Sequence, residues 1–323
     1  MRSLPLQRGP ARSPGTAAIG DRDRGFVLII VIAVLGLLAL AAAGFAQVTR
    51  SQVKAAASNV GSSTAQALAD AGVQLAVLDL VLSRQDPSYQ RRFAVGEKPF
   101  QCDAGDGRRL AVSITDEAGK VDLNAASDRL LQALLVGVGA GKGLADAIVD
   151  FRDDDNIKRP LGAEREEYSA AGRTGPKNAP FSAVEEIEQV LGVDAELAAR
   201  LRPHITVYTG QPGIDTGSAS RELQAILARG LGSDTGPAPS TSPDQGSDSD
   251  GTLRPMPFVG AQGRRFFAVH AEASADSSAF VREAILELGQ SRARPYTFLR
   301  WYRGALREGG DAGLEAVGLA PCP

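Results

Sequence analysis

The chain has 323 residues, enough for one membrane helix and one or two compact domains, and it carries 35 basic and 38 acidic residues. This slightly acidic balance excludes a protein that binds polyanions through its bulk charge. The two histidines lie far apart in sequence, without Cys or acidic partners at a zinc spacing, so no zinc site is predicted.

The amino-terminal residues separate into a basic leader and an apolar run. Residues 1–25 are rich in Arg, Pro and Gly, and we expect them to be disordered and then removed. The residues from Phe26 to Ala46 contain no polar or charged side chain. A helix of this length spans roughly 30 Å, which is the hydrocarbon thickness of a bilayer. The sequence therefore predicts a transmembrane helix over residues 26–46 with its basic amino end in the cytoplasm.

Three interpretations of this start are open: a cleaved secretory signal, a plain signal anchor and a prepilin-type processing site. The apolar run is longer than a usual secretory signal core. Gly25 followed by Phe26 resembles the site where a prepilin peptidase cuts type IV pilins and pseudopilins. An Ala-rich amphipathic pattern without Pro then continues to about Arg84, which predicts one helix of nearly sixty residues. Pilin-like subunits use such a helix to pack into a filament.

The middle of the chain changes from a strand to short helices. Alternation around Leu110, Val112 and Ile114 predicts a half-buried strand. Two helix pairs, which resemble helix-hairpin-helix units, follow between residues 122 and 202, and Asn124 is predicted to cap the first helix.

The Gly-rich turn at residues 137–143 could be part of a nucleotide-binding or nucleic-acid-binding site. It matches neither a phosphate-binding loop nor a dinucleotide fingerprint, because Gly143 replaces the required Ser or Thr and Lys142 replaces the last Gly. Residues 122–206 contain ten Lys and Arg against fifteen Asp and Glu, so counterion release contributes little affinity for DNA. We expect a helix-helix turn and no nucleic-acid partner.

An acidic cluster offers the oxygen ligands that calcium prefers. Its spacing is not that of an EF-hand, because the fifth position counted from Asp153 is Ile157, and a solvated acidic surface is the alternative interpretation. No catalytic constellation is found, so an enzyme is not predicted. The candidate calcium ligands are Asp153, Asp154, Asp155, Glu164 and Glu167.

The two cysteines, Cys102 and Cys322, permit a single disulfide. An oxidising periplasm would allow this bridge, which would tie down the carboxyl end; two unpaired thiols are the alternative.

The carboxyl-terminal third is predicted to return to β structure. A strand at residues 205–207 comes first. Residues 232–257 are expected to form a flexible loop, because their first part, residues 232–251, contains no apolar side chain larger than Ala. Three β-like runs then predict an antiparallel meander. The aromatic side chains of Phe298 and Trp301 are predicted to lie in the sheet core. The three runs cover residues 265–272, 280–288 and 296–302.

Several phrases between residue 24 and about residue 229 together resemble the GspK family, the large minor pseudopilins of type II secretion systems. They are RGFVLIIVIAVLGLLALAAAGFA, ALADAGVQLAVLDL, DEAGKVDLNAAS, ADAIVDFRDDD, GAEREEY, NAPFSAVEEIEQVLGV and LRPHITVYT. The resemblance implies an α+β pilin-like fold with a long amino-terminal transmembrane helix, an antiparallel sheet and an inserted all-α domain of the helix-hairpin-helix or SAM-like kind. The strand at 205–207 would then rejoin the sheet beside the strand around Val112. The implied parts are a cleaved leader (1–25), a transmembrane helix (26–46), a first body segment (47–121), the insert (122–206) and a second body segment (207–323).

One position departs from the common pilin pattern. Most pilin-like proteins carry Glu at the fifth mature residue, where it pairs with the amino terminus of a neighbouring subunit, and here that residue is Ile30. A buried charge without a partner is costly, so this chain suits the end of a filament.

The resemblance implies a structural role as the tip subunit of a periplasmic pseudopilus that supports protein export across the outer membrane. Its implied partners are the I- and J-type minor pseudopilins, the major pseudopilin, the prepilin peptidase and the inner membrane, which the chain crosses once with its body in the periplasm. Methylation of the new amino terminus and calcium sites also belong to this expectation. A membrane-anchored helix-hairpin-helix DNA-binding protein and a pilus-tip adhesin are the alternatives.

Overall fold

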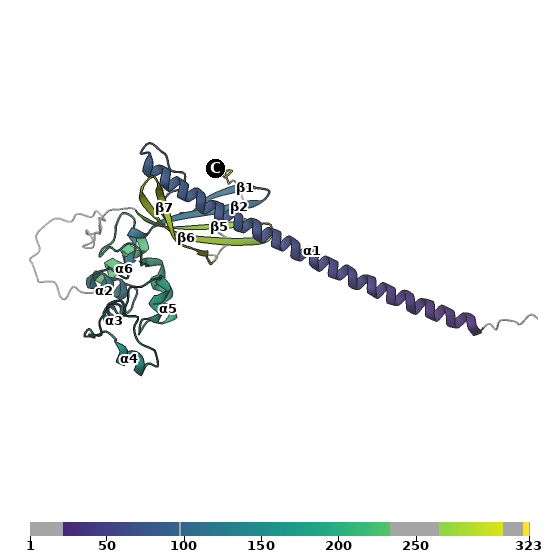
Figure 1. Cartoon of the computed structure of the whole chain (residues 1–323), viewed down its shortest axis with the longest axis horizontal. Helices are drawn as coiled ribbons and strands as arrows, with labels where there is room; N and C mark the ends of the chain where they lie inside the picture. The colour runs from purple at the N-terminus through teal and green to yellow at the C-terminus, as the bar shows by residue number, and fades with distance from the viewer. Residues whose placement is uncertain (1–21, 97, 233–264, 306–318, 323) are drawn as a thin grey trace, which may run out of the picture. The chain divides into compact units, whose positions relative to one another are not determined.

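The computed structural model describes residues 22–96, 98–232, 265–305 and 319–322, and the chain divides into two units, Met1–Val60 and Gly61–Pro323 (Figure 1). Helix α1 (Arg22–Gln85) runs through both units. Most of the expected leader, residues 1–21, and almost all of the expected loop at 232–257 lie outside the described residues.

The first unit consists, in its described part, of the amino-terminal half of α1. Every side chain from Phe26 to Val60 is exposed. Within the described residues, α1 is the one helix long and apolar enough to cross a membrane. It ends at Gln85, directly before the Asp86-Pro87 pair that disfavours further helix. The prediction of a single long helix is therefore confirmed.

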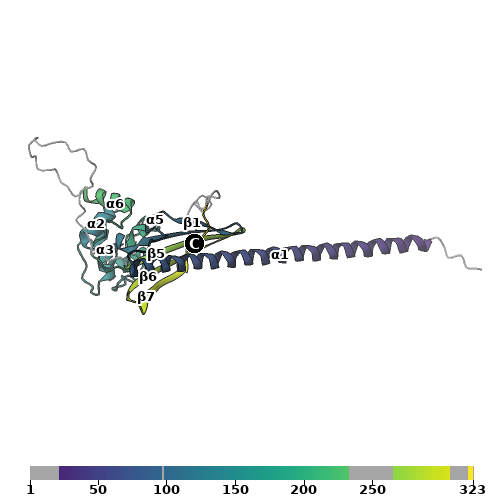
Figure 2. The ribbon, with the colours of Figure 1, turned by 90° about the horizontal axis from the view of Figure 1, so that it is seen from above.

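The second unit contains an antiparallel sheet with strand order β1-β2-β5-β6-β7. The meander predicted at the carboxyl end is confirmed as β5, β6 and β7, and β2 joins it by pairing with β5. Figures 1 and 2 show strands of this sheet from two directions. The strands are β1 (Phe100–Gly105), β2 (Arg108–Asp116), β5 (Phe266–Ala275), β6 (Ser278–Ser291) and β7 (Arg294–Arg303).

The second half of α1 packs on this sheet through small side chains. Ala65, Ala69 and Ala76 are fully buried in the cluster that α1 forms with the sheet. A Cβ atom added at Gly72 would lie 2.8 Å from the Leu110 side chain, so the helix approaches β2 too closely for any larger residue. The Ala-rich pattern of the sequence thus sets the distance between helix and sheet.

Strand β2 is buried on both faces, which differs from the half-buried strand that its alternation predicts. Ala111 and Ser113 were the expected outward positions, and both are buried. They pair with Glu272 and His270 of β5, whose longer side chains shield small neighbours inside a sheet.

The helical insert has its own core, rich in Leu and aromatic side chains. A short parallel pair, β3 (Val121–Asp122) and β4 (Ile205–Thr206), brings the two ends of its predicted span together. The remaining elements are α2 (Asp128–Gly137), α3 (Leu144–Arg152), α4 (Arg165–Ala170), α5 (Ala195–Leu201) and α6 (Arg221–Gly232), with three-residue to six-residue 3-10 turns at Glu117–Gly119, Val184–Gln189 and Arg202–His204.

Two expectations for residues after 204 are corrected by this core. The strand at 205–206 pairs with β3 and does not rejoin the large sheet. The insert also continues beyond the expected boundary at 206, because Ile214, Leu223 and Leu227 are buried in its core. Helix α6 is amphipathic, and it buries its apolar side chains against α2.

The cap of α2 is also different from the predicted one. Ser127 is the capping residue, and its side chain accepts a hydrogen bond from the Leu130 backbone nitrogen. Asn124 instead bonds the backbone of Phe181, both as donor and as acceptor, at 2.9 and 2.7 Å. Asn124 therefore connects two segments that lie 57 residues apart in sequence. The local sequence pattern cannot predict such a contact.

Trp301 is not part of the sheet core. Its side chain lies on the edge strand β7 and is 38% exposed, while Phe298 is only partly buried. The core prediction for Trp301 fails because the order of the strands leaves β7 at the edge.

Candidate functional site

The predicted processing site lies near the start of α1. Gly25 and Phe26 are consecutive residues of this helix, and the Phe26 side chain is 67% exposed. Ile30 follows one turn later and is also exposed. The apolar side chains of this segment are thus free to contact lipid or other apolar helices.

The acidic loop after α3 is organised by a buried carboxylate. Asp150 is fully buried and accepts a hydrogen bond from the Arg159 backbone nitrogen at 3.2 Å. Gly162 passes so close that an added Cβ would lie 1.9 Å from Asp150 Oδ2. Burial raises the pKa of Asp150. This carboxylate therefore fixes the path of the loop between α3 and α4.

Three of the five predicted calcium ligands come together on this loop. One carboxylate oxygen each from Asp153, Asp155 and Glu164 lies within 4.8 Å of the others. Glu164 is buried, Asp153 is half-buried and Asp155 is exposed, so the group sits at the surface with one deep side.

Part of this group is buried. Asp153 Oδ1 and both carboxylate oxygens of Glu164 are buried, and within the described residues the Glu164 side chain faces only the Glu167 backbone nitrogen, in a capping box too loose to count as a hydrogen bond. Burial, and after it the neighbouring carboxylates, raises the pKa of Asp153 and of Glu164. Buried oxygens without donors are costly to leave unpaired, and an all-oxygen donor set suits a hard cation such as calcium.

The other two predicted ligands lie outside the group. Glu167 accepts a hydrogen bond from Lys158 Nζ at 2.5 Å and another from the Glu164 backbone nitrogen at 3.0 Å. The Lys158 contact comes first among the causes that lower the pKa of Glu167 to about 2. Asp154 is exposed and is not part of the group of three. The sequence could not separate these residues, because which acids converge depends on the fold of the loop.

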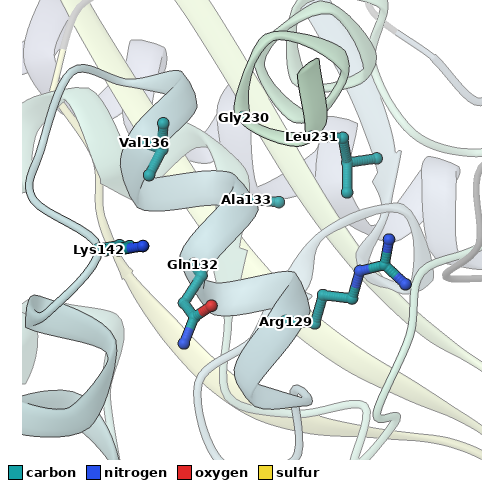
Figure 3. Close-up of a pocket in the computed structure, with 7 residues that line it drawn as sticks. All are labelled: Arg129, Gln132, Ala133, Val136, Lys142, Gly230 and Leu231. Atoms are coloured by element: carbon teal, nitrogen blue, oxygen red, sulfur yellow. The ribbon is translucent and has the colours of Figure 1, made fainter. Parts of the chain in front are cut away.

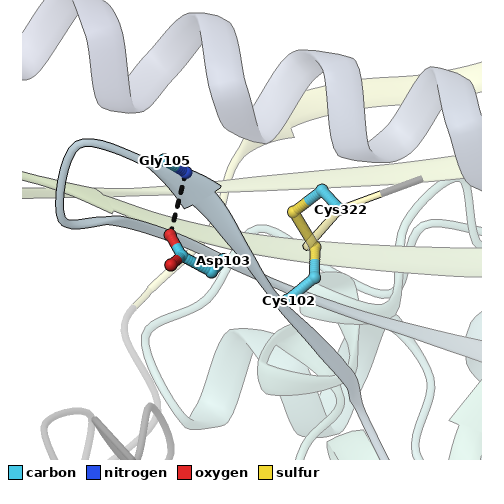
Figure 4. Close-up of a disulfide and its surroundings, with 4 residues drawn as sticks. All are labelled: Cys102, Asp103, Gly105 and Cys322. Carbon is cyan, nitrogen blue, oxygen red and sulfur yellow. Dashed lines mark hydrogen bonds between the residues drawn. A yellow bond between two sulfur atoms is a disulfide. The ribbon is translucent and has the colours of Figure 1, made fainter. Parts of the chain in front are cut away.

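The two cysteines lie together at one edge of the sheet. Cys102 of β1 and Cys322, 220 residues later, are joined by a disulfide (Figure 4). Beside it, the Asp103 backbone nitrogen donates to the Ala320 carbonyl and the Cys322 nitrogen donates to the Asp103 carbonyl, both at 2.8 Å. The side chain of Asp103 accepts from the Gly105 nitrogen. Backbone hydrogen bonds and the disulfide therefore hold the described segment around Cys322 on β1.

The Gly-rich turn connects α2 and α3, as predicted from its failure to match phosphate-binding patterns. Gly137 ends α2, and a Cβ added there would lie 2.1 Å from the Ile226 carbonyl oxygen of α6. A small pocket of about 250 Å³ opens beside this helix contact, with Arg129 and Lys142 at its rim (Figure 3). The glycine serves helix packing.

Comparison with known proteins shows a family similarity in the middle of the chain. A family model described as type II secretion system (T2SS), protein K, matches residues 110–210, which include β2 and most of the helical insert. Over these residues the chain is similar to the type II secretion system protein K family. A member of this family is a minor pseudopilin, a structural component of the secretion system.

A solved structure agrees with this assignment at the level of the fold. The chain is similar to a chain in the crystal structure of the GspK-GspI-GspJ complex from the enterotoxigenic Escherichia coli type 2 secretion system. The TM-score is 0.52 at 18% identity, and the match covers 80% of this chain and 99% of that chain. The expected α+β pilin-like fold with its inserted helices is thus confirmed. A search of curated proteins finds no match.

Two acids of α1 make polar contacts that the sequence pattern did not predict. Asp79 of α1 is buried and accepts hydrogen bonds from the Tyr89 hydroxyl and the Arg92 backbone nitrogen, both at 2.9 Å. Asp70 pairs with Arg282 of β6 at 2.5 Å. An acid on the buried face of an amphipathic helix was the available signal for both residues.

Proposed function

We propose that this minor pseudopilin occupies the tip of the type II secretion pseudopilus and supports pseudopilus assembly and protein export. Two features of its amino-terminal segment support the proposal: the exposed apolar helix and the absence of an acid at Ile30. A helix with Ile30 offers no carboxylate to the amino terminus of a subunit that would join above it. An amino group left unpaired among apolar helices is costly, so further addition is disfavoured.

Maturation is proposed to occur between Gly25 and Phe26, by a prepilin peptidase, with methylation of the new amino terminus. Removal of the leader would place Phe26 at the start of the apolar run. A helix that begins with the apolar segment can then leave the bilayer and pack against other apolar helices, because no basic leader holds it at the cytoplasmic surface.

The proposed partners are the I- and J-type minor pseudopilins and the major pseudopilin, with the inner membrane as the anchor before assembly. The body would lie in the periplasm. The exposed side chains of α1 from Phe26 to Val60 support helix-to-helix packing as the mode of contact. The similar crystal structure is of a complex that contains GspI and GspJ.

We further propose that Asp153, Asp155 and Glu164 hold a calcium ion. The ion would neutralise the converging carboxylates and supply a partner to the buried oxygens of Asp153 and Glu164. Its role would be to clamp the loop after α3 onto the start of α4, without any part in a chemical reaction.

The first experiment is the amino-terminal sequence and mass of the membrane-extracted protein, with and without the prepilin peptidase. The expected mature chain starts at Phe26, carries one added methyl group, and is found only when the peptidase is present. A start at Met1 in both samples, or a cut near Ala46, contradicts the proposed maturation.

Tip position needs a separate measurement. Pseudopili assembled with the tagged chain, labelled with antibody and viewed by electron microscopy, are expected to carry label at one end only. Label along the filament length contradicts the tip position, and label outside intact cells favours an adhesin.

A further inference from the structure

The two edge strands of the sheet, β1 and β7, differ in whether another described segment pairs with them. At the β1 edge, Pro321 forms a parallel bridge with Asp103, and the disulfide between Cys102 and Cys322 fixes this segment in place. An edge strand presents unpaired backbone N–H and C=O groups unless something covers it. The β1 edge is therefore partly closed by the chain's own end.

Among the residues that the structure describes, none covers the opposite edge in this way. Strand β7 (Arg294–Arg303) pairs with β6 on one side, and within the described residues no segment pairs with its other side. Along the strand, exposed and half-buried residues alternate. Pro295 lies near its start, and the stretch from Tyr296 to Arg303 contains no further proline that would block a new ladder of hydrogen bonds.

Apolar side chains are exposed at the centre of this edge. Leu299 is 39% exposed and Trp301 is 38% exposed. The Trp301 ring packs edge-on against Phe298, with centroids 4.9 Å apart, and the Arg282 guanidinium lies 5.2 Å from its centroid. Trp and Arg are enriched among the residues that dominate binding energy at protein interfaces.

The charge of this edge selects the kind of partner. Residues 292–303 contain four Arg and no acid, although the whole chain has more acidic than basic residues. Of these four, only Arg300 has an ion pair with an acid of the described chain, to Glu185 at 2.9 Å. A second copy of β7 would place Arg beside Arg, and like charges opposite one another destabilise a strand pair.

We propose that the outer edge of β7 is a docking site for an acidic, extended segment of another protein, which adds to the sheet as a further strand. Backbone hydrogen bonds would supply the pairing, Leu299 and Trp301 the apolar contact, and Arg294 and Arg303 the preference for acidic side chains. This site is distinct from helix packing through α1, and it does not rest on the proposed tip position.

The test uses the full-length chain in detergent and follows the fluorescence of Trp301, the single tryptophan of the chain. The probe is an acetylated and amidated peptide of alternating Glu and Val. Two matched peptides serve as controls: one with Lys in place of Glu, and one of the Glu–Val sequence with N-methyl groups on alternate backbone nitrogens, which prevents strand addition. Saturable binding of the first peptide alone is expected.

Protein variants then locate the site. R294E/R303E is expected to weaken binding of the Glu–Val peptide about tenfold, since both basic positions are reversed. The control R165E/R221E makes the same change in net charge at exposed helix starts in the insert, where acids are favoured, and should bind like the wild type. If R294E/R303E does not fold, R292E in the turn between β6 and β7 provides the same comparison.

Hydrogen exchange completes the test, because strand addition protects outward amides of β7 and side-chain docking alone does not. Equal binding of the N-methylated peptide, equal binding by R294E/R303E, or no binding at millimolar peptide overturns the proposal. Self-association that is abolished by R294E/R303E overturns it as well, because the occupant would then be a second copy.

Discussion

The sheet with the second half of α1 and the helical insert achieve their buried cores in contrasting ways. In the former, Ala65, Ala69 and Ala76 bring the helix backbone close to the sheet, and the disulfide fastens the far edge. The insert buries larger side chains on short helices and joins its segments through polar groups such as the buried Asp122 and the half-buried Asn124.

This difference teaches where each region is vulnerable. The sheet region depends on one extended contact between a long helix and the sheet. Its disulfide adds stability because it closes a long loop and so restricts the unfolded chain. Short helices are marginal alone and depend on tertiary contacts, so a single lost contact between them affects the whole insert. Region-resolved hydrogen exchange can test this contrast with four changes, from the largest expected effect to the smallest.

Loss of the disulfide should act on the sheet region. The variant C102S/C322S is expected to lower the free energy of unfolding by about 4 kcal/mol, because the bond closes a long loop in the unfolded chain. Guanidinium titration of oxidised wild type and variant measures the loss, and exchange should rise first in β1. Free thiols in protein taken from the periplasm would contradict a disulfide in the cell.

The insert should be most sensitive to substitutions where α2 and α6 pack closely. A Cβ atom added at Gly230 would lie 1.8 Å from the Ala133 carbonyl oxygen, so Gly230→Val is expected to cost about 3 kcal/mol and to expose the insert while β5 and β6 stay protected. Gly232→Val is the matched control, because no atom of the described residues lies within 4 Å of a Cβ added there. Equal stability of the two variants would contradict the close approach.

The corrected role of Asn124 can be tested against the helix cap. Asn124→Ala leaves the backbone nitrogen and carbonyl of Phe181 without partners and should cost about 2 kcal/mol. Ser127→Ala removes the observed cap of α2 and should cost about 1 kcal/mol or less, since its hydrogen bond is long at 3.4 Å. Thermal unfolding ranks the two, and the reverse order would restore Asn124 as the cap.

Calcium and pH should both change the stability of the insert through Asp153 and Glu164. The raised pKa values of Asp153 and Glu164 mean that the folded state holds these protons more tightly than the unfolded state. In the absence of calcium, stability should therefore increase as pH falls through the raised pKa values towards the ordinary values of 3.8 and 4.5, where the gain is complete.

Glu164→Gln sharpens this prediction at neutral pH. Without calcium the variant should be more stable than the wild type by about 1 kcal/mol, because a buried charge without a partner is removed. It should also lose the stabilisation that added calcium gives the wild type. Glu196→Gln, at an exposed position of α5, is the control and should change neither. Equal responses of wild type and Glu164→Gln to calcium would contradict the site.

How much could be predicted depended on the distance in sequence over which each contact acts. The long helix and the three closing strands were visible in local periodicity and in helix-breaking residues such as Pro87. The acidic loop was visible only as a set of candidates, because Asp153, Asp155 and Glu164 converge through the buried Asp150 and the close passage of Gly162. The position of Trp301 could not be read from its own strand, since exposure depends on which strand lies at the edge.

The sequence by itself determined the apolar helix after Gly25, the element types and the family resemblance, because these depend on residue type and on short-range spacing. Tertiary structure alone decided that residues 205–206 pair with β3, that α6 completes the insert, and that β1 and β7 form the two edges of the sheet. These choices rest on contacts between segments tens to hundreds of residues apart, where shape and hydrogen-bond pairing act and periodicity carries no information.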